Sequence, residues 1–410
     1  MTTEEFISTH LTDDPRRLAL QRDRFPGVDF AFALDQIEGW QRARTKLPQW
    51  AATRGVVFPP HLSMEQCSSE ATARYKAAIV ARLGKDGGLH TLVDLTGGYG
   101  VDFAYLAPAF RRAVYVERQE HLCRIARHNM DLLGLARAEI CHADGTDVLH
   151  DMPRRGRGDG DRTLVFVDPA RRDAHGGRVY GLADCAPNVV EMQDELLDKA
   201  DVVMLKLSPM LDIDAALQHL GHVAEVHVVS VDNECKELLV VMGRADGGLR
   251  CCCADIHGGQ TTLFLYGDRD GGAPPQAGDV AEGDYLYEPN ASIMKAGCFA
   301  EVGRRLELGQ LDANSHLFAG REWRPDFPGR KFRIRAVTSL NKHELRRALG
   351  GLKRANITVR NFPLGVADLR RRLKLGDGGD TYIFATTVRG RHLLLVTERP
   401  GAEKPEAHHP

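Results

Sequence analysis

The sequence lacks the features of a membrane or exported protein. Its most apolar segments, such as Val202–Leu207 and Val226–Val231, are far shorter than the ~20 residues of a membrane-spanning helix. Residues 1–12 contain no basic stretch followed by an apolar one, so we expect no signal peptide. The 9 cysteines include no CxxC pair, and three of them form the run Cys251–Cys253 along an expected strand. We therefore expect free buried thiols, no metal site and a cytoplasmic location.

The chain as a whole has no strong charge of either sign, because 54 Lys and Arg residues nearly balance 56 Asp and Glu residues. That balance is uneven along the chain. Residues 321–399 hold about 19 basic against about 7 acidic side chains, roughly +12, which leaves about −14 for the rest. Hydrophobic (43%) and charged (27%) residues are near the globular average, which excludes collagen-like and wholly disordered chains. With 410 residues, the chain is expected to form two or three domains.

Residue patterns predict helices first and then a mainly parallel sheet. Apolar residues at three-to-four spacing predict the helices Pro15–Asp23, Ala31–Arg44 and Ser69–Leu83. After these, short β-branched runs alternate with helical stretches, which indicates a parallel sheet with helical crossovers. The expected strands are His90–Leu95, Ala113–Glu117, Glu139–Cys141, Thr163–Val167 and Val202–Leu207. Two further strands are separated only by a short polar turn and must pair antiparallel; they are Ala224–Val231 and Glu237–Met242.

The residue pattern of the remaining chain predicts a loop followed by a compact module. Gly267–Gly283 is rich in glycine and aspartate and is expected to be a linker or an exposed loop. Residues 331–397 show a βαβαββ pattern. The tail Gly401–Pro410 is rich in proline and charge and is expected to be disordered.

The first expected strand runs into a glycine-rich turn, Thr96-Gly97-Gly98-Tyr99-Gly100, which opens a helix. Glycines let the backbone approach a ligand closely, and the helix N-terminus supplies unpaired N–H groups. The dinucleotide fingerprint G-x-G-x-x-G is absent. Asp94 ends the strand, where a carboxylate can meet the ammonium group of a ligand.

Polar residues also end the next strands. Glu117 ends the second strand, where a carboxylate can accept both ribose hydroxyls of an adenosine-containing ligand. Asp144 follows the third strand, placed to meet an adenine amino group, and Val167-Asp168-Pro169-Ala170-Arg171 ends the fourth. Any one of these acids is compatible with a solvated strand end or a helix cap. Ligands of open α/β sheets bind at the carboxyl ends of the strands, so the row together predicts one cleft.

These residues and the antiparallel hairpin resemble the class I S-adenosylmethionine-dependent methyltransferases, over Leu89–Arg244. The resemblance implies a Rossmann-like, seven-stranded α/β sheet whose last strand is antiparallel, with S-adenosyl-L-methionine as cofactor. The cofactor-binding residues that it implies are Asp94, Thr96, Gly97, Gly98, Gly100, Asp102, Glu117 and Asp144. Of these, Glu117 would hold the ribose and Asp144 the adenine. Two residues depart from the family pattern: Thr96 stands at a usual glycine position, and Ala170 stands at a usual second proline.

The same resemblance places Asp168, Pro169 and Arg171 at the target, as catalytic residues. Lys206 ends the fifth strand and lies on the same edge by topology. We expect it to contact a phosphate or the target base, with a solvated lysine at a strand end as the alternative.

The whole chain is similar to bacterial methyltransferases with a C-terminal THUMP-like domain. Lys353-Arg354-Ala355-Asn356-Ile357 and Arg360-Asn361-Phe362-Pro363 carry this resemblance. The domains expected are a helical region at 1–84, a methyltransferase domain at 85–266, a ferredoxin-like α+β segment at 284–328, a basic THUMP-like domain at 329–400 and a disordered tail at 401–410. The resemblance favours tRNA or rRNA as partner. The RNA-binding residues expected are Arg346, Arg347, Lys353, Arg354, Arg370 and Arg371.

The expected function is therefore methylation of an RNA base by direct displacement. Two alternatives keep the methyl donor site. In one, the substrate is a protein or small molecule and the C-terminal module serves for docking or dimerisation. In the other, which Ala170 suggests, the protein binds cofactor and RNA without turnover. A nicotinamide enzyme is a further alternative from a different class.

Overall fold

The computed structural model describes residues 1–85, 88–155, 161–170, 181–243, 248–267 and 272–400. These residues form two compact units. Unit 1 comprises Met1–Val231 and Lys236–Leu249, and unit 2 comprises Asp232–Cys235 and Arg250–Pro410.

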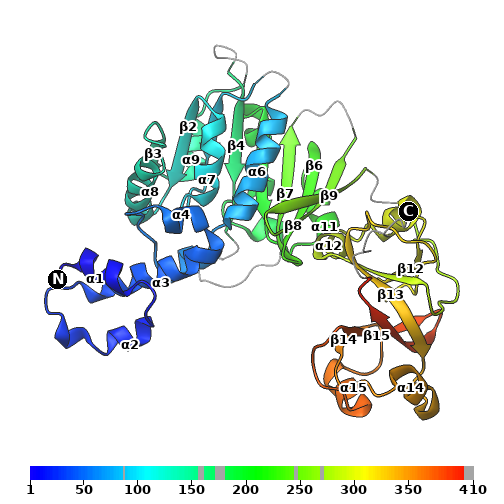
Figure 1. Cartoon of the computed structure of the whole chain (residues 1–410). Coiled ribbons are helices and arrows are strands. Elements are labelled where there is room, and N and C mark those ends of the chain that lie inside the picture. The colour runs from blue at the N-terminus through cyan, green and yellow to red at the C-terminus, as the bar shows by residue number, and fades with distance from the viewer. Residues whose placement is uncertain (86–87, 156–160, 171–180, 244–247, 268–271, 401–410) are drawn as a thin grey trace, which may run out of the picture. The chain divides into compact units, whose positions relative to one another are not determined.

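Unit 1 begins with helices, as the apolar spacing predicts (Figure 1). They are α1 (Thr3–His10), α2 (Pro15–Ala19), α3 (Phe30–Lys46), α4 (Pro48–Ala52), α5 (His61–Gln66) and α6 (Glu70–Leu83). The side chain of Ser69 accepts a hydrogen bond from the Thr72 N–H and caps α6, which confirms the expected helix start. The prediction of one helix over Pro15–Asp23 is wrong in its second half, because α2 ends at Ala19 and a separate 3-10 turn follows.

The strands of unit 1 lie close to the predicted ranges. They are β1 (Thr91–Asp94), β2 (Arg112–Glu117), β3 (Glu139–His142), β4 (Thr163–Val167), β5 (Val202–Leu207), β6 (Val223–Val231) and β7 (Glu234–Gly243). Their order in the sheet is β3-β2-β1-β4-β5-β7-β6. The first five pair in parallel, and β7 pairs antiparallel with β5. The predicted parallel sheet with an antiparallel strand near its end is therefore confirmed.

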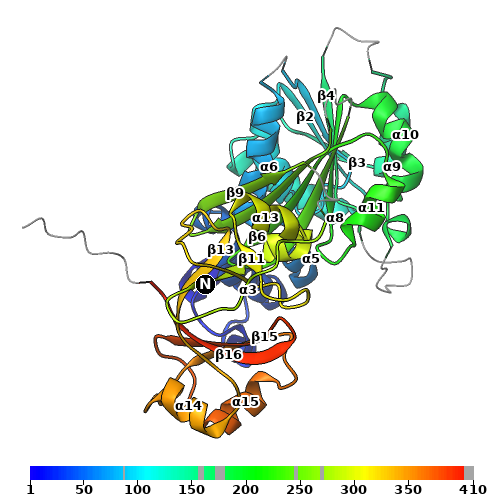
Figure 2. The same cartoon turned by 90° about the vertical axis from the view of Figure 1, so that its right-hand side faces the viewer.

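Helices cover both faces of this sheet, as a parallel sheet buried on two sides requires. The helices that follow the strands are α7 (Val101–Leu106), α8 (Glu120–Leu132), α9 (Gly145–Asp151), α10 (Val189–Lys199) and α11 (Ile213–His219). In Figure 2, α6 lies on one side of the strands, whereas α9 and α10 lie on the other. Helix α6 packs against α7, so the N-terminal helical region reaches the helix that the glycine turn opens.

Unit 2 contains a hairpin and a second sheet. The hairpin consists of β8 (Arg250–His257) and β9 (Gln260–Tyr266). The sheet has the order β11-β12-β10-β13-β16-β15-β14. Its strands and helices are β10 (Tyr285–Pro289), α12 (Ala291–Ala296), α13 (Phe299–Arg305), β11 (Gly309–Gln310), β12 (Phe318–Gly320), β13 (Gly329–Thr338), α14 (Lys342–Leu349), β14 (Asn356–Arg360), α15 (Val366–Leu373), β15 (Thr381–Val388) and β16 (Arg391–Glu398). The predicted βαβαββ order of the last part is confirmed.

Two predictions about unit 2 have different outcomes. Cys251, Cys252 and Cys253 are buried cysteines on β8, as expected from their position along a strand. The expected linker at Gly267–Gly283 is not an exposed loop throughout its described part. Ala277 is buried, and its N–H donates to the carbonyl of Gln310 at 2.9 Å, which ties this loop to the second sheet. The tail Gly401–Pro410 lies outside the described residues.

Candidate active site

The turn after β1 requires glycine at three positions, for its backbone conformation or for its packing. Gly98 and Gly100 have φ angles of +54° and +85°, in the left-handed region that favours glycine. A Cβ at Gly97 would lie 2.2 Å from the ring of Tyr115, so a larger residue cannot fit there. Gly100 is also the residue that precedes α7. The N–H groups of Gly97 and Gly100 donate to the carbonyls of Val116 and Gly97, both at 2.8 Å, so the glycines let the backbone itself, rather than free N–H groups, lie close to a ligand at the carboxyl edge of the sheet.

Asp94 ends β1 beneath this turn and is almost completely buried. Its Oδ1 accepts the Thr96 N–H at 3.0 Å. Burial raises the pKa of Asp94 well above its usual value, against the opposing effect of that hydrogen bond. The nearby carboxylates of Asp102, Asp168 and Glu117 raise it further. A cation that binds beside Asp94 would therefore relieve an unfavourable charge arrangement.

Glu117 ends β2 and is oriented by two backbone groups. Its Oε2 accepts the Gly98 N–H at 3.0 Å, and its Oε1 accepts the Gln119 N–H at 2.8 Å. Each carboxylate oxygen keeps further acceptor capacity, which suits a pair of ribose hydroxyls. Asp144 lies after β3, where the Ala143 N–H donates to the carbonyl of Glu117 at 3.2 Å. The ends of β2 and β3 are therefore adjacent, as the sequence predicts.

Asp144 itself is exposed and acts as the N-cap of α9. Its Oδ1 accepts both the Thr146 hydroxyl at 2.6 Å and the Thr146 N–H at 2.9 Å. These hydrogen bonds lower the pKa of Asp144. The capping role does not exclude an adenine contact, because the second carboxylate oxygen can accept another hydrogen bond.

Thr96 has a role that a glycine could not fill. Its hydroxyl accepts the Asp168 N–H at 2.6 Å and so joins the turn after β1 to the end of β4. The departure from the family pattern thus supports the position of Asp168. The Asp168 carboxylate forms an ion pair with Lys206 at the end of β5. Pro169 follows Asp168 at the same strand end, whereas Arg171 lies outside the described residues.

Asp102, for which the resemblance implies a role in cofactor binding, lies in a network of buried charges. Its Oδ2 accepts the Ser68 hydroxyl at 2.7 Å and lies 3.6 Å from the Lys206 Nζ, while its Oδ1 lies 3.1 Å from the Lys76 Nζ. Burial alone would raise the pKa of Asp102, but Lys76 and Lys206 outweigh burial and lower it. Asp102 therefore belongs to a buried ion network that includes Lys76 and Lys206.

Sequence reasoning missed three members of this network, Ser68, Lys76 and Glu237. The Lys76 Nζ donates to Glu237 Oε1 at 2.5 Å and to the Ser68 hydroxyl at 3.2 Å. A signal was present in α6, where Lys76 follows the buried Ala73 by one turn and precedes the buried Ile79 by another. A lysine on the apolar face of a helix needs a carboxylate partner.

The pKa of Asp94 leads to a prediction about the cofactor that the resemblance implies, a methyl donor that carries a sulfonium and an ammonium group. Below its raised pKa the Asp94 carboxyl is protonated, and a bound cation favours the ionised form. Donor affinity should therefore rise with pH above the usual carboxyl value of 3.8, by at most about tenfold per unit for one proton. Calorimetry in buffers of different ionisation enthalpy should show proton release on binding. Asp94→Asn should abolish this release; release that persists in the variant would assign it to another group.

The basic residues expected to bind RNA lie in unit 2, and several already have partners. Arg370 pairs with Asp377 at 2.7 Å, and Arg371 pairs with Asp368. Arg354 donates through Nε to the Asp377 carbonyl at 2.7 Å. The other expected residues are Arg346 and Arg347 on α14 and Lys353 after it. Exposed ion pairs are weak, so these pairs leave the arginines able to exchange to phosphates.

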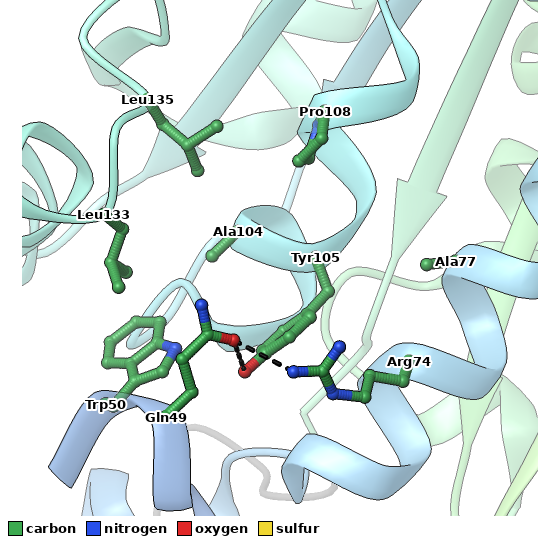
Figure 3. Close-up of a pocket in the computed structure, with 9 residues that line it drawn as sticks. All are labelled: Gln49, Trp50, Arg74, Ala77, Ala104, Tyr105, Pro108, Leu133 and Leu135. Atoms are coloured by element: carbon green, nitrogen blue, oxygen red, sulfur yellow. Dashed lines mark hydrogen bonds between the residues drawn. The ribbon is translucent and has the colours of Figure 1, made fainter. Parts of the chain in front are cut away.

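A cavity of about 370 Å³ in unit 1 is a separate feature (Figure 3). It is lined by the second half of α7 and by α4 and α6, so it lies at the opposite end of α7 from the glycine turn. The Gln49 Oε1 accepts the Tyr105 hydroxyl and an Arg74 N–H, both at 3.0 Å. This cavity contains none of the predicted site residues.

Among the described residues, no group of three or more His, Cys, Asp or Glu side chains is arranged to hold a metal ion. Over the same part of the chain, no helix has the length and hydropathy that crossing a bilayer requires.

Comparison with known proteins gives the same fold and a family. A THUMP domain-like family model matches residues 329–399, and a ferredoxin-like domain model matches residues 285–328. A protein from Porphyromonas gingivalis W83, solved by crystallography and assigned as a methyltransferase, has 31% sequence identity and a TM-score of 0.82. The alignment covers 97% of each chain. An uncharacterized S-adenosylmethionine-dependent methyltransferase of Mycobacterium tuberculosis (strain H37Rv) is 28% identical over 338 residues, which are 82% of this chain and 86% of that relative.

The sheet topology and the glycine turn define an α/β methyltransferase fold. The chain belongs to the S-adenosylmethionine-dependent methyltransferases with a THUMP-like domain. The predicted family, fold class and cofactor are thereby confirmed.

Proposed function

We propose that this enzyme methylates a base of RNA, in tRNA or rRNA, at the carboxyl edge of the unit 1 sheet. The observation that carries this proposal is the match of residues 329–399 to the THUMP domain-like model, within a segment of roughly +12 charge. A basic module of this kind favours contact with a phosphate backbone. A protein or small-molecule substrate would not require such an excess of positive charge.

In this proposal the residues around the glycine turn hold the donor. Asp94 receives the ammonium group, Glu117 the ribose hydroxyls and Asp144 the adenine, with the backbone of Gly97, Gly98 and Gly100 beside the methionine part. The positive φ angles of the turn and the acceptor capacity of Glu117 fit such a ligand. When bound, S-adenosylmethionine supplies a methyl group on a positively charged sulfur.

The protein then has to orient the acceptor, because the donor is already activated. Asp168 lies at the open edge and accepts a hydrogen bond from Lys206. Burial lowers the pKa of Lys206, but Asp168 and Asp102 outweigh it, so this pKa lies above its usual value. Lys206 therefore stays protonated and does not act as a base. Asp168 accepts a hydrogen bond from the amino group of the target base, which turns the nitrogen lone pair toward the methyl group, and the surplus proton leaves to water.

The test of this function uses RNA from a strain that lacks the gene. The purified full chain is incubated with methyl-labelled S-adenosylmethionine and this RNA, and the nucleosides are then separated by mass spectrometry. We expect one methylated nucleoside that is absent from the deletion strain and restored by the protein. Label that appears in protein or metabolite fractions but not in RNA would contradict the proposal.

RNA binding by unit 2 should depend strongly on salt. Replacing Arg346, Arg347, Lys353 and Arg354 together by Gln should weaken tRNA binding and lower the slope of log affinity against log salt by about 0.7 per lost phosphate contact. The matched control replaces Arg16 and Arg17 of α2, where Arg17 is highly exposed. Filter binding at several salt concentrations measures both variants. An unchanged slope in the fourfold variant would exclude these residues from the RNA interface.

A further inference from the structure

Five side chains of unit 1 form a row of alternating charge that ends at the proposed acceptor site. The row runs through Glu237 on β7, Lys76 on α6, Asp102 on α7, Lys206 on β5 and Asp168 after β4. The first four side chains are at most 11% exposed, and Lys76 is 0% exposed. The Asp168 side chain is the most exposed of the five, with 36% of its area exposed.

Stability alone does not account for this arrangement. A buried ion pair adds little net stability compared with apolar side chains of similar size, because both ions lose their hydration. Four members of the row are buried, and the fifth, Asp168, is partly exposed. The positions of the buried side chains therefore determine where the Asp168 carboxylate lies. The Asp168 backbone is held as well, through its N–H bond to Thr96.

We propose that Lys76 and Glu237 are positioning residues that hold the Asp168 carboxylate at the acceptor site through Asp102 and Lys206, an inference that rests on the proposed function. Neither residue reaches the site edge itself, since both are buried. Lys206 lies between two carboxylates, in contact with Asp168 and 3.6 Å from Asp102. Lys76 shares the charge of Asp102 and so leaves Lys206 free to hold Asp168.

Removing Lys76 should shift this balance. Asp102 would then have Lys206 as its remaining cation in the row and would draw the Lys206 ammonium inward, away from Asp168. The acceptor nitrogen would lose its alignment with the methyl group, whereas the donor-binding residues Asp94 and Glu117 would keep their contacts. Misalignment of about 1 Å is enough to slow a reaction by about 100-fold, so a loss of at least about tenfold in kcat is expected.

The test compares the full-length wild-type protein with Lys76→Met and with the double variant Lys76→Met/Glu237→Gln. The double variant removes opposite charges together and so leaves no new unpaired ion, which keeps the fold if the single variant proves unstable. Arg82→Met is the matched control, because Arg82 lies on the same helix α6 but pairs with Glu225 on β6, which is not a member of the row. Unfolding midpoint, donor affinity, RNA methylation and a crystal structure are measured for each.

The proposal predicts that the double variant unfolds near the wild-type temperature and binds donor normally, yet methylates RNA at least about tenfold more slowly. Its crystal structure should show Lys206 nearer Asp102 and the pair with Asp168 broken. A double variant with wild-type methylation, or with an intact Lys206–Asp168 pair, would overturn the proposal. Failure of the wild-type protein to methylate RNA would refute the proposed function, while the crystal structures would still decide whether Lys76 positions Asp168.

Discussion

Glu117→Ala should weaken S-adenosylmethionine binding by at least about 100-fold, because each hydrogen bond to a charged group contributes about 1.5–3 kcal/mol. The carboxylate has two tasks in our account. It accepts the proposed bonds from the ribose, and it already accepts the Gly98 N–H, so its loss also releases the glycine turn. Isothermal titration calorimetry with the donor measures the effect, and the demethylated product should lose affinity to the same extent.

The control for this variant is Glu139→Ala. Glu139 begins β3 at the opposite edge of the sheet and forms an exposed ion pair with Arg112. Its removal should leave donor affinity unchanged, since exposed pairs contribute little and no donor contact is lost. Equal losses of affinity in the two variants would mean that the loss in Glu117→Ala does not come from a donor contact at Glu117.

Asp168→Asn should reduce kcat for methyl transfer by about 100-fold or more and leave donor affinity nearly unchanged. A preorganised charged acceptor at a reaction centre typically contributes this much. The amide keeps the size of the side chain but loses the negative charge, and the buried Lys206 then lacks one of its two carboxylates. Single-turnover measurements with saturating donor isolate the chemical step.

A companion variant tests whether the Lys206 cation is needed to hold Asp168. Lys206→Met removes the cation and should also lower kcat, because Asp168 loses the ion pair that holds it. For Asp168→Asn itself, a fall in methylation rate no larger than the fall in donor affinity would mean that the carboxylate acts on the donor. The acceptor role assigned to Asp168 would then be incorrect.

Much of the fold could be predicted from sequence because its signals are local. β4 and β5 are apolar runs buried on both faces, and their bounds match the predicted strands. The positions of Asp94, Glu117 and Asp168 at one edge of the sheet could be predicted from topology, since parallel strands bring their carboxyl ends to one edge. The glycine-rich turn and the acids at the strand ends could be predicted without knowing how the side chains pack.

The ion network could not be predicted, because it depends on contacts distant in sequence. Lys76 and Glu237 are 161 residues apart, and only the packing of α6 against the sheet brings them together. The resemblance implies a cofactor role for Asp102, but no sequence signal indicates that its Oδ1 lies 3.1 Å from the Lys76 Nζ. The hydrogen bond of the Thr96 hydroxyl could not be predicted either. Its partner, the Asp168 N–H, is within reach only because β4 lies beside β1.

A crystal structure of the full chain with bound S-adenosylmethionine tests the central claim most directly. We expect the ammonium group beside Asp94, the ribose hydroxyls on Glu117 and the methyl group directed toward Asp168. Donor bound elsewhere, such as in the cavity of Figure 3 between α4, α6 and α7, would contradict it.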